Sequence, residues 1–446
     1  MSALAQVLLA LGRRVTGSDR FHDQGERLEV LARLRAAGVE IVPQDGSAVH
    51  SGLSAVVVST AIEESNPDLQ RARALGVPVL HRAGMLAQIV RGRRLVAVTG
   101  TSGKTTVTGM IGWILDQAGR DPSVVNGGAL VNWRSGTRIG NVRMGRSDLW
   151  VIEADESDRS LLRFDPDWSV ITNASADHFS LSEAQAVFRE FAAQTRRAVV
   201  CGPGISGLLR ERAFPCARVD VPEPAEVRLQ PRLGFRHSGV AVELPLMGRH
   251  NIENAAAAIT LCAQLGVRVE EAAAALAAFH GIERRLQIAG VARGVTVVDE
   301  YAHNPAKIAA AWDAVKTPAG RVLGVWRPHG YGPLALMMAD LVESLARVCG
   351  GGDAIFILPV FYAGGTAARS VVSDDLVVAL RSRGVAAEPA PDYEALMSRL
   401  LELCRAGDVV LCMGARDPNL PRFARRLVER IEQDGAARSF PGTAAP

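Results

Sequence analysis

A glycine-rich segment with a single lysine is the part of the sequence with the most specific chemistry. It reads Gly100-Thr101-Ser102-Gly103-Lys104-Thr105-Thr106, between the apolar run 95–99 and a helix that we expect to end near residue 118. Backbone N–H groups of such a turn, with the N-terminus of the following helix, can surround phosphate oxygens. Lys104 would place a positive charge at the β- and γ-phosphates, and the Thr105 hydroxyl would hold Mg²⁺. The general pattern asks for a glycine where Val98 stands, so the segment matches a shorter variant of a phosphate-binding loop.

Two further polar segments each follow an apolar run that predicts a buried strand. The run Glu153 to Asp158 holds four carboxylates directly after residues 149–152, and Asp177-His178 comes shortly after residues 168–172. Ligand and metal sites in open parallel sheets lie at the carboxyl ends of strands. We therefore expect Glu153 and His178 to be Mg²⁺ ligands beside the phosphates that Lys104 would contact. Either segment taken alone fits an ordinary solvated turn as well.

Three later segments carry weaker signals, and each fits a structural role as well as a functional one. The run 248–254 ends at Asn254, whose amide could pair with an adenine edge, although polar residues at a helix start are often caps. The pair Arg284-Arg285 offers cations for a transferring phosphoryl group. The pair Asp299-Glu300 ends another predicted strand and precedes Tyr301.

The elements that position these residues alternate between helix and strand, which predicts an α/β protein with parallel sheets. Residues 1–92 read as a Rossmann-like domain that begins directly on a helix (2–12), so its usual first strand and Gly-rich turn are expected to be absent. A central domain with the phosphate-binding loop is expected over 93–288, and a C-terminal α/β domain over 289–434. Residues 435–446 are rich in Gly, Ala, Ser and Pro, and we expect them to be a disordered tail.

Composition limits the class of protein. With 446 residues, 48% of them hydrophobic and 22% charged, the chain predicts a globular protein of several domains. A net charge of +3 gives no reason to expect nucleic acid, and no apolar run of 18 residues predicts a membrane span. The six cysteines form no CxxC pair, so a reducing, cytoplasmic location is expected. Only three of the 50 basic residues are lysines, so Lys104 is one of only three candidates for any role that needs a side-chain amine.

In their combination and order, these segments resemble the Mur ligase family, in particular its alanine-adding branch. The segments that carry the resemblance are 1–5, 17–19, 59–62, 99–106, 126–128, 153–158, 173–178, 250–254, 284–285, 299–305 and 327–329. The resemblance implies three domains: one for a UDP-sugar, one for ATP and one that closes over the nucleotide and receives the amino acid. It also implies that ATP phosphorylates a carboxylate and that an amine then attacks the acyl phosphate, during peptidoglycan synthesis.

The resemblance also implies roles for individual residues. Thr105, Glu153 and His178 would bind metal, Lys104, His178 and Arg285 would act in catalysis, and Asn254 would read adenine. The acidic pair Asp299-Glu300 would touch the ribose. The substrate contacts would come from Ser18, Asp19, Asn126, Gly127, His303 and His329. The implied partners are ATP, Mg²⁺, UDP-N-acetylmuramate and a small amino acid, with the chain as a monomer or homodimer.

Several positions depart from the family pattern. Glu300 stands where Asp is usual before Tyr301, and the opening strand and turn of the UDP-binding domain are not seen, which predicts either a shortened start or altered UDP binding. Where the alanine-adding branch has an Arg-containing run, this chain has Gly330-Tyr331-Gly332-Pro333. Arginine is the usual clamp for a carboxylate, so the amino acid could differ from alanine.

Three hypotheses therefore remain open at this level. The first is a working ligase on a UDP-muramoyl substrate. The second is a nucleotide-binding relative without ligase activity, and the third is a ligase for another carboxylate, as in folylpolyglutamate-type relatives.

Overall fold

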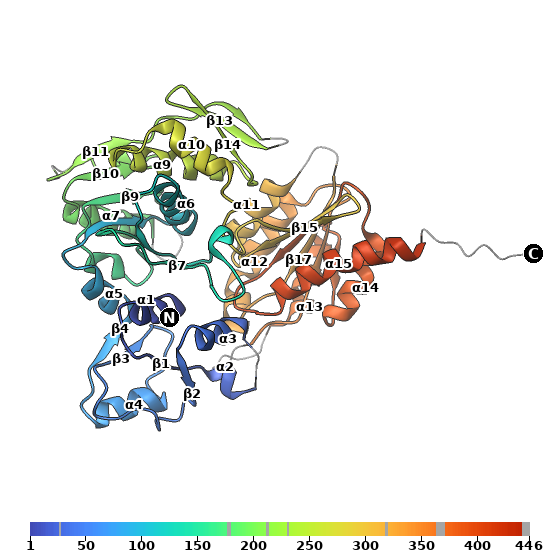
Figure 1. Ribbon diagram of the computed structural model, residues 1–446. Coiled ribbons are helices and arrows are strands. Elements are labelled where there is room, and N and C mark those ends of the chain that lie inside the picture. Colours follow the sequence, from blue (N-terminus) through green and yellow to red (C-terminus); the bar gives the residue numbers. More distant parts are fainter. Residues whose placement is uncertain are drawn as a thin grey trace, which may run out of the picture. The chain divides into compact units, whose positions relative to one another are not determined.

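The computed structural model describes residues 1–25, 28–175, 180–210, 214–229, 232–316, 320–362 and 371–438 (Figure 1). The chain forms two compact units. Unit 1 comprises residues 1–245 and 249–282, and unit 2 comprises residues 246–248 and 283–446. The first two expected domains thus lie in unit 1, and unit 2 begins at Glu283, a few residues before the boundary expected at 289. Within the described ranges, no helix is both long enough and apolar enough to cross a bilayer.

The first part of unit 1 contains two separate pairs of parallel strands. Its elements are α1 (Ser2–Ala10), β1 (Thr16–Ser18), α2 (Arg20–Asp23), α3 (Glu29–Ala36), β2 (Glu40–Val42), β3 (Val56–Val58), α4 (Pro67–Ala74), β4 (Val79–His81) and α5 (Arg82–Val90). Strand β1 pairs with β2, and β3 pairs with β4. The alternation and the parallel pairing confirm the α/β expectation for this region, but the described strands do not form one continuous sheet.

The rest of unit 1 is built on a seven-stranded sheet in the order β11-β10-β9-β5-β8-β6-β7. Its elements are β5 (Arg94–Thr99), α6 (Lys104–Gln117), β6 (Ser123–Val125), η1 (Val131–Trp133), β7 (Val142–Arg143), β8 (Leu149–Glu153), η2 (Ser160–Arg163), β9 (Trp168–Ile171), α7 (Leu181–Gln194), β10 (Ala198–Cys201), α8 (Ile205–Leu208), β11 (Ala217–Asp220), α9 (His250–Gln264) and α10 (Val269–Ala277). All strands are parallel except β7. Strand β5 lies at the centre and is buried from Leu95 onward, as its unbroken apolar run predicts.

A small antiparallel sheet follows in unit 1, which the sequence reading did not distinguish from the mixed α/β region. It consists of β12 (Ala225–Arg228), β13 (Leu233–His237) and β14 (Val240–Leu244). Helix α10 packs against β14, and α6 packs against α9. The helix that begins just after the phosphate-binding loop is therefore held between the sheet and the Ala-rich helix α9, whose small side chains allow close approach.

Unit 2 contains a six-stranded sheet in the order β15-β16-β20-β17-β18-β19. Its elements are β15 (Gln287–Ala292), β16 (Val295–Glu300), α11 (Pro305–Val315), β17 (Val322–Trp326), α12 (Tyr331–Val348), β18 (Ala354–Ile357), α13 (Ser373–Ser382), β19 (Ala387–Pro389), α14 (Tyr393–Leu403), β20 (Val409–Met413) and α15 (Leu420–Arg438). Strands β16, β20, β17, β18 and β19 are parallel, and β15 joins the edge antiparallel to β16. The parallel strands bring their carboxyl ends to one edge of the sheet.

Two details of local structure differ from what the sequence indicated. Residues 82–90 form α5, although the sequence reading placed no element between the strand near 80 and the polar joint at 91–94. Helix α15 continues to Arg438, four residues into the expected disordered tail. Residues 439–446 lie outside the described residues, as do residues 26–27 of the helix expected over 26–37.

Candidate active site

The glycine-rich loop joins β5 to α6 and is held to the end of the neighbouring strand β9. Gly103 is the N-cap of α6 and has a left-handed backbone (φ 84°), which glycine adopts without strain. The Ser102 N–H donates to Asn173 Oδ1 at 3.0 Å, and the Thr172 hydroxyl donates to the Ser102 carbonyl at 2.6 Å. The predicted strand–loop–helix arrangement is therefore confirmed, and the loop is fixed by residues about 70 positions later in the chain.

Asn254 lies against this loop. Its side chain is buried, and its Nδ2 donates to Asn251 Oδ1 at 3.0 Å. A β-carbon at Gly103 would collide with the Asn254 amide, so this position also needs glycine for space. The structure thus brings Asn254 to the phosphate-binding loop, whereas its role in reading adenine stays a prediction.

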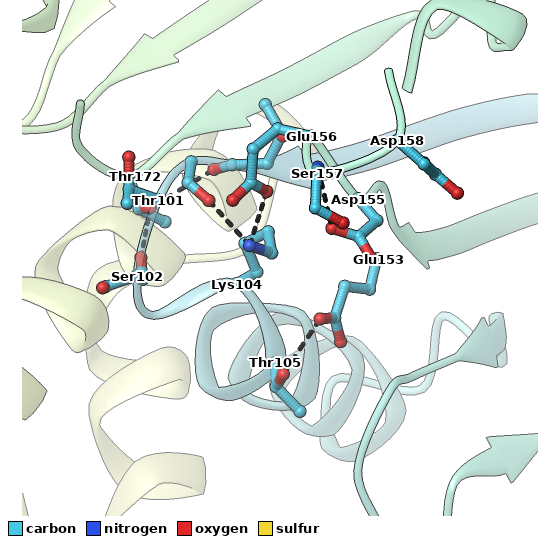
Figure 2. A network of polar contacts seen from close by, with 12 residues as sticks. Thr101, Ser102, Lys104, Thr105, Glu153, Asp155, Glu156, Ser157, Asp158 and Thr172 are labelled. Atoms are coloured by element: carbon cyan, nitrogen blue, oxygen red, sulfur yellow. Dashed lines mark hydrogen bonds and ion pairs between the residues drawn. The ribbon is translucent and has the colours of Figure 1, made fainter. Parts of the chain in front are cut away.

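Lys104 points back across the loop toward the acidic run (Figure 2). Its Nζ donates to Glu156 Oε2 at 2.5 Å and to the Gly100 carbonyl at 2.9 Å. Both side chains of this ion pair are largely buried, with 14% of Lys104 and 4% of Glu156 exposed. Burial raises the pKa of the Glu156 carboxyl above its usual value, although the Lys104 ammonium acts in the opposite direction. The acidic run was predicted as part of the site, but Glu156 was not predicted as the partner of Lys104.

Glu153 joins the start of α6 to the loop that follows β6. Its Oε1 accepts from the Thr105 hydroxyl at 3.0 Å, and its Oε2 accepts from the Gly127 N–H at 2.8 Å. A β-carbon on Gly127 would come within 2.5 Å of Glu153 Oε2, so the close approach depends on glycine. Thr105 and Glu153, predicted as metal ligands, and Gly127, predicted as a substrate residue, are therefore brought together by strands β5, β6 and β8, which lie side by side in the sheet.

These residues suit a Mg²⁺ ion that is held mainly by nucleotide phosphates. Mg²⁺ keeps several waters and uses one or two protein oxygens in such sites. Thr105 and Glu153 supply a hydroxyl and a carboxylate 3.0 Å apart at the start of α6, which fits that donor set. Within the described part of the chain, no cluster of three or more His, Cys, Asp or Glu side chains could hold a metal by itself. His178, the third predicted ligand, lies outside the described residues.

A cavity of about 180 Å³ opens beside Glu153. It is lined by residues 1–4 at the start of α1, by Arg82, Ala83 and Leu86 of α5, and by Val125, Asn126, Gly127, Asn141, Glu153, Asp155, Ser160 and Phe164. Asn126 is 2% exposed, and its Nδ2 has no hydrogen-bond partner among the described residues. A buried amide without a partner is costly, so this donor is available to a polar ligand. The predicted substrate residues Asn126 and Gly127 therefore line a cavity next to the Glu153 carboxylate, whose role as a metal ligand stays a prediction.

The far side of the acidic run is tied to α5, which the sequence reading missed. Arg82 Nη2 lies 3.2 Å from Asp155 Oδ2 and 3.9 Å from Asp158 Oδ2, and His81 Nε2 lies 3.6 Å from Asp158 Oδ2. Burial acts to raise the pKa of Asp155, but Lys104, Ser157 and Arg82 together lower it below its usual value. The acidic run is thus held from two sides, by Lys104 and by the start of α5.

Two of the predicted substrate residues have structural partners elsewhere in unit 1. The Ser18 hydroxyl donates to Asp68 Oδ2 at 2.6 Å. Asp19 is the N-cap of α2, and its Oδ1 accepts from the N–H groups of Phe21 and His22. Neither residue lines the cavity beside Glu153. Their part in substrate binding stays a prediction.

In unit 2, the acidic pair at the end of β16 is buried among cations and backbone donors. Burial raises the pKa of Asp299 to about 6, although Arg284, whose Nε lies 3.5 Å from Asp299 Oδ1, acts to lower it. Glu300 Oε2 accepts from the Leu286 N–H at 2.6 Å, and burial raises the pKa of Glu300 as well. Arg285, the predicted phosphoryl-binding cation, is exposed and lies 5.5 Å from the centre of the Tyr301 ring. These carboxylates have a clear structural role, and contact with a ribose stays a prediction.

The two histidines of unit 2 that were predicted to contact substrate, His303 and His329, pack against each other. The rings of His303 and His329 lie edge to face, with centroids 5.3 Å apart. His303 Nδ1 is 3.0 Å from the Tyr301 carbonyl, which favours the tautomer with a proton on Nδ1. Burial, with His303 and Arg416 nearby, lowers the pKa of His329 to about 4, so this imidazole is neutral at neutral pH.

Comparison with known proteins gives a consistent result along the chain. Three family models match: the catalytic domain of the Mur ligase family over residues 1–94, the Mur ligase middle domain over 98–190, and the Mur ligase glutamate ligase domain over 284–416. UDP-N-acetylmuramate–L-alanine ligase from Acidiphilium cryptum is 36% identical over 97% of this chain and 93% of its own length. The enzyme of the same name from Bradyrhizobium sp. is 34% identical over 98% of this chain and 96% of its own length.

Solved structures agree in fold. UDP-N-acetylmuramate-alanine ligase from Thermotoga maritima has a TM-score of 0.78, with 26% identity and 97% of both chains covered. A murein peptide ligase from Psychrobacter arcticus has a TM-score of 0.69 at 21% identity, over 97% of this chain and 96% of its own. The second likeness supports the fold alone.

Proposed function

Since this chain belongs to the Mur ligase family, we propose that it is an ATP-dependent ligase that joins L-alanine to the carboxylate of UDP-N-acetylmuramate in peptidoglycan synthesis. The relatives that match nearly all of its length carry this activity in their names. The observation that carries the proposal is the arrangement around Lys104, in which a phosphate-binding loop, a carboxylate beside a hydroxyl and a polar cavity adjoin one another.

The reaction has two steps. A carboxylate oxygen of the sugar substrate attacks the γ-phosphorus of ATP, and ADP leaves, which gives an acyl phosphate. The amine of the amino acid then attacks the acyl carbon, an amide forms, and phosphate leaves with the oxygen that came from the carboxylate. The amine proton that is lost passes to phosphate or to solvent.

The residues of the loop support the first step. Transfer of a phosphoryl group needs positioning and charge neutralisation more than covalent chemistry by the protein. Lys104 carries the cation, and Glu156 with the Gly100 carbonyl fixes its Nζ at the mouth of the loop. Mg²⁺, when bound with ATP, would be held by Thr105 and Glu153 and would neutralise the charge on the phosphates.

The cavity beside Glu153 is where we propose that the reacting end of the sugar substrate lies. Its wall offers the unpartnered Asn126 Nδ2, and Arg82 lines it with an exposed fraction of 40% for its side chain. A carboxylate placed there is close to the start of α6, where the positive end of the helix dipole and Lys104 favour negative charge.

The test is an incubation of the protein with ATP, Mg²⁺, UDP-N-acetylmuramate and a pool of amino acids, followed by phosphate release and product mass. We expect one phosphate per amide and a product whose mass corresponds to added alanine. A product with a different amino acid would correct the substrate but keep the ligase. Absence of any amide product, with ATP binding intact, would contradict the proposed function.

A further inference from the structure

Three neighbouring strands of unit 2 place one arginine and two histidines at the same level of the sheet edge. Strands β16, β20 and β17 are adjacent and parallel. Their register aligns both Glu300 and Trp326 with Met413, the last residue of β20. His303, Arg416 and His329 each stand three residues beyond that common line. The carboxyl edge of a parallel sheet is where ligands bind, so these three residues lie where a ligand of unit 2 is expected.

The backbone at Arg416 adopts a conformation that arginine rarely takes. Its φ is 65°, in the left-handed region that favours glycine. The turn is held in place by the next residue: Asp417 is fully buried, and its Oδ2 accepts from Arg327 Nη1 at 2.6 Å. Strain of this kind persists where the surroundings impose it, and it concentrates at binding and active sites.

The guanidinium of Arg416 differs in its contacts from those of Arg327 and Arg284, which lie near the same edge. Arg327 is paired with Asp417, and Arg284 donates to the Gly414 carbonyl and lies beside Asp299. Arg416 is exposed, and in the described part of the chain it makes no hydrogen bond or ion pair. Its positive charge nevertheless acts on the imidazole of His329, together with the ring of His303. Because His329 is neutral, its ring can offer a hydrogen bond without repelling a cation.

His329 has unused hydrogen-bonding capacity at the same place. Its Nδ1 is buried and has no hydrogen-bond partner among the described residues. An uncharged imidazole with one free nitrogen, beside an exposed guanidinium, suits a small anion that accepts several hydrogen bonds. A carboxylate has that chemistry, and arginine can bind it through two parallel N–H bonds.

We propose that Arg416 binds the α-carboxylate of the incoming amino acid, with the imidazole of His329 beside it. The proposal rests on the proposed function, since an amino-acid substrate is required by it. It assigns to this chain a carboxylate clamp on the loop after β20, while the loop after β17 carries Gly330 and Tyr331 instead of arginine. It also predicts that alaninamide, which lacks the carboxylate, is a much poorer substrate than alanine.

The experiment compares Arg416→Gly with Arg293→Gly. Arg293 is also an exposed arginine with a left-handed backbone (φ 49°), but it lies in the turn between β15 and β16, at the opposite end of β16. Glycine relieves the backbone strain in both variants, so both should fold at least as well as the wild type. We expect Arg416→Gly to raise KM for alanine by about 10- to 100-fold, as for the loss of charged hydrogen bonds, with KM for ATP within twofold. Arg293→Gly should leave both constants unchanged.

The variant Arg416→Lys separates the contribution of the positive charge from that of the bidentate hydrogen bonding of the guanidinium. Lysine keeps the β-carbon and the positive charge but loses the two-pronged geometry, so its KM for alanine should fall between those of the wild type and Arg416→Gly. An unchanged KM for alanine in Arg416→Gly, or an equal rise in KM for all three substrates, would overturn the proposal. A wild type that forms no amide with any amino acid would instead count against the proposed function, and the two failures are therefore distinct.

Discussion

Two sheet edges of the protein differ in the charges that they present: the edge around Lys104 in unit 1 and the edge around Arg416 in unit 2. In unit 1 the cations are paired with carboxylates, Lys104 with Glu156 and Arg82 with Asp155, and a further carboxylate, Glu153, accepts from Thr105. In unit 2 the exposed Arg416 acts on the imidazole of His329, whose ring contacts that of His303. A site with both signs of charge suits a polyanion that arrives with a metal ion, whereas an arginine without a carboxylate partner, beside a neutral imidazole, suits a single small anion.

The largest effect should come from the cation of unit 1. Lys104→Ala should lower kcat by about a thousandfold or more, because the transferring phosphoryl group loses its main positive charge from the protein. The fold should survive, since burial already raises the pKa of Glu156 and this carboxyl can take up a proton once Lys104 is gone. Steady-state phosphate release and circular dichroism measure the two properties.

Lys316→Ala is the matched control for that change. Lys316 also donates to a carboxylate and to a backbone carbonyl, those of Asp353 and Val348, but it belongs to unit 2 and lies in no proposed site. Its replacement should leave kcat within about threefold, as is usual for the loss of a partly exposed pair. If both lysine variants lost activity alike, the special role of Lys104 would be refuted.

A smaller effect is expected at the hydroxyl that contacts Glu153. Thr105→Val keeps the shape of the side chain but removes the hydroxyl, so the Mg²⁺ concentration for half-maximal activity should rise by about 10- to 100-fold. Thr108→Val is the control, because Thr108 is buried one turn further along α6 and its hydroxyl has no hydrogen-bond partner among the described residues. A Mg²⁺ titration in which the two variants behave alike would remove Thr105 from the metal site.

The smallest effect concerns the pH dependence of stability in unit 2. Burial raises the folded-state pKa of Asp299 to about 6, above its usual 3.8, so the folded form binds the proton more tightly. The resulting stabilisation is fully present below the usual pKa and is lost as pH rises through about 6. Asp299→Asn should therefore flatten the dependence of the unfolding free energy on pH across this window, as measured by urea denaturation.

Asp121 is the control for this prediction, because its pKa is lowered in the folded protein whereas that of Asp299 is raised. Arg146 and Arg143 lower its pKa to about 2, so its own titration lies below that window. Asp121→Asn should shift the stability curve by a constant amount and leave its slope unchanged. A wild-type slope that persists in Asp299→Asn would show that another group, such as Glu300, dominates the titration.

The same comparison shows how far the sequence could predict the site. The loop from Gly100 to Thr106 was predicted because its function depends on a local strand–loop–helix pattern. Glu153 was named as well, because strand ends in a parallel sheet meet at one edge, whereas Gly127 was named from the family resemblance. The pairing of Lys104 with Glu156, and of Arg82 with Asp155, joins residues 52 and 73 positions apart and depends on tertiary packing.

The edge of unit 2 shows the limit most clearly. His303 and His329 were predicted as substrate residues, yet nothing in the sequence indicated that β20 lies between their strands. Arg416 was therefore not predicted as a site residue. Its left-handed backbone, with a φ of 65°, is known only from the structure. Strand order and register, which come from long-range packing, were the missing information.

The most direct test of the central claim follows the carboxylate oxygen. UDP-N-acetylmuramate labelled with ¹⁸O in its carboxylate is incubated with the enzyme, ATP, Mg²⁺ and alanine, and the released phosphate is analysed by mass spectrometry. An acyl phosphate predicts that one ¹⁸O atom appears in each phosphate and that ADP is the nucleotide product. Unlabelled phosphate, or label in AMP, would contradict phosphoryl transfer to the carboxylate at the Lys104 loop.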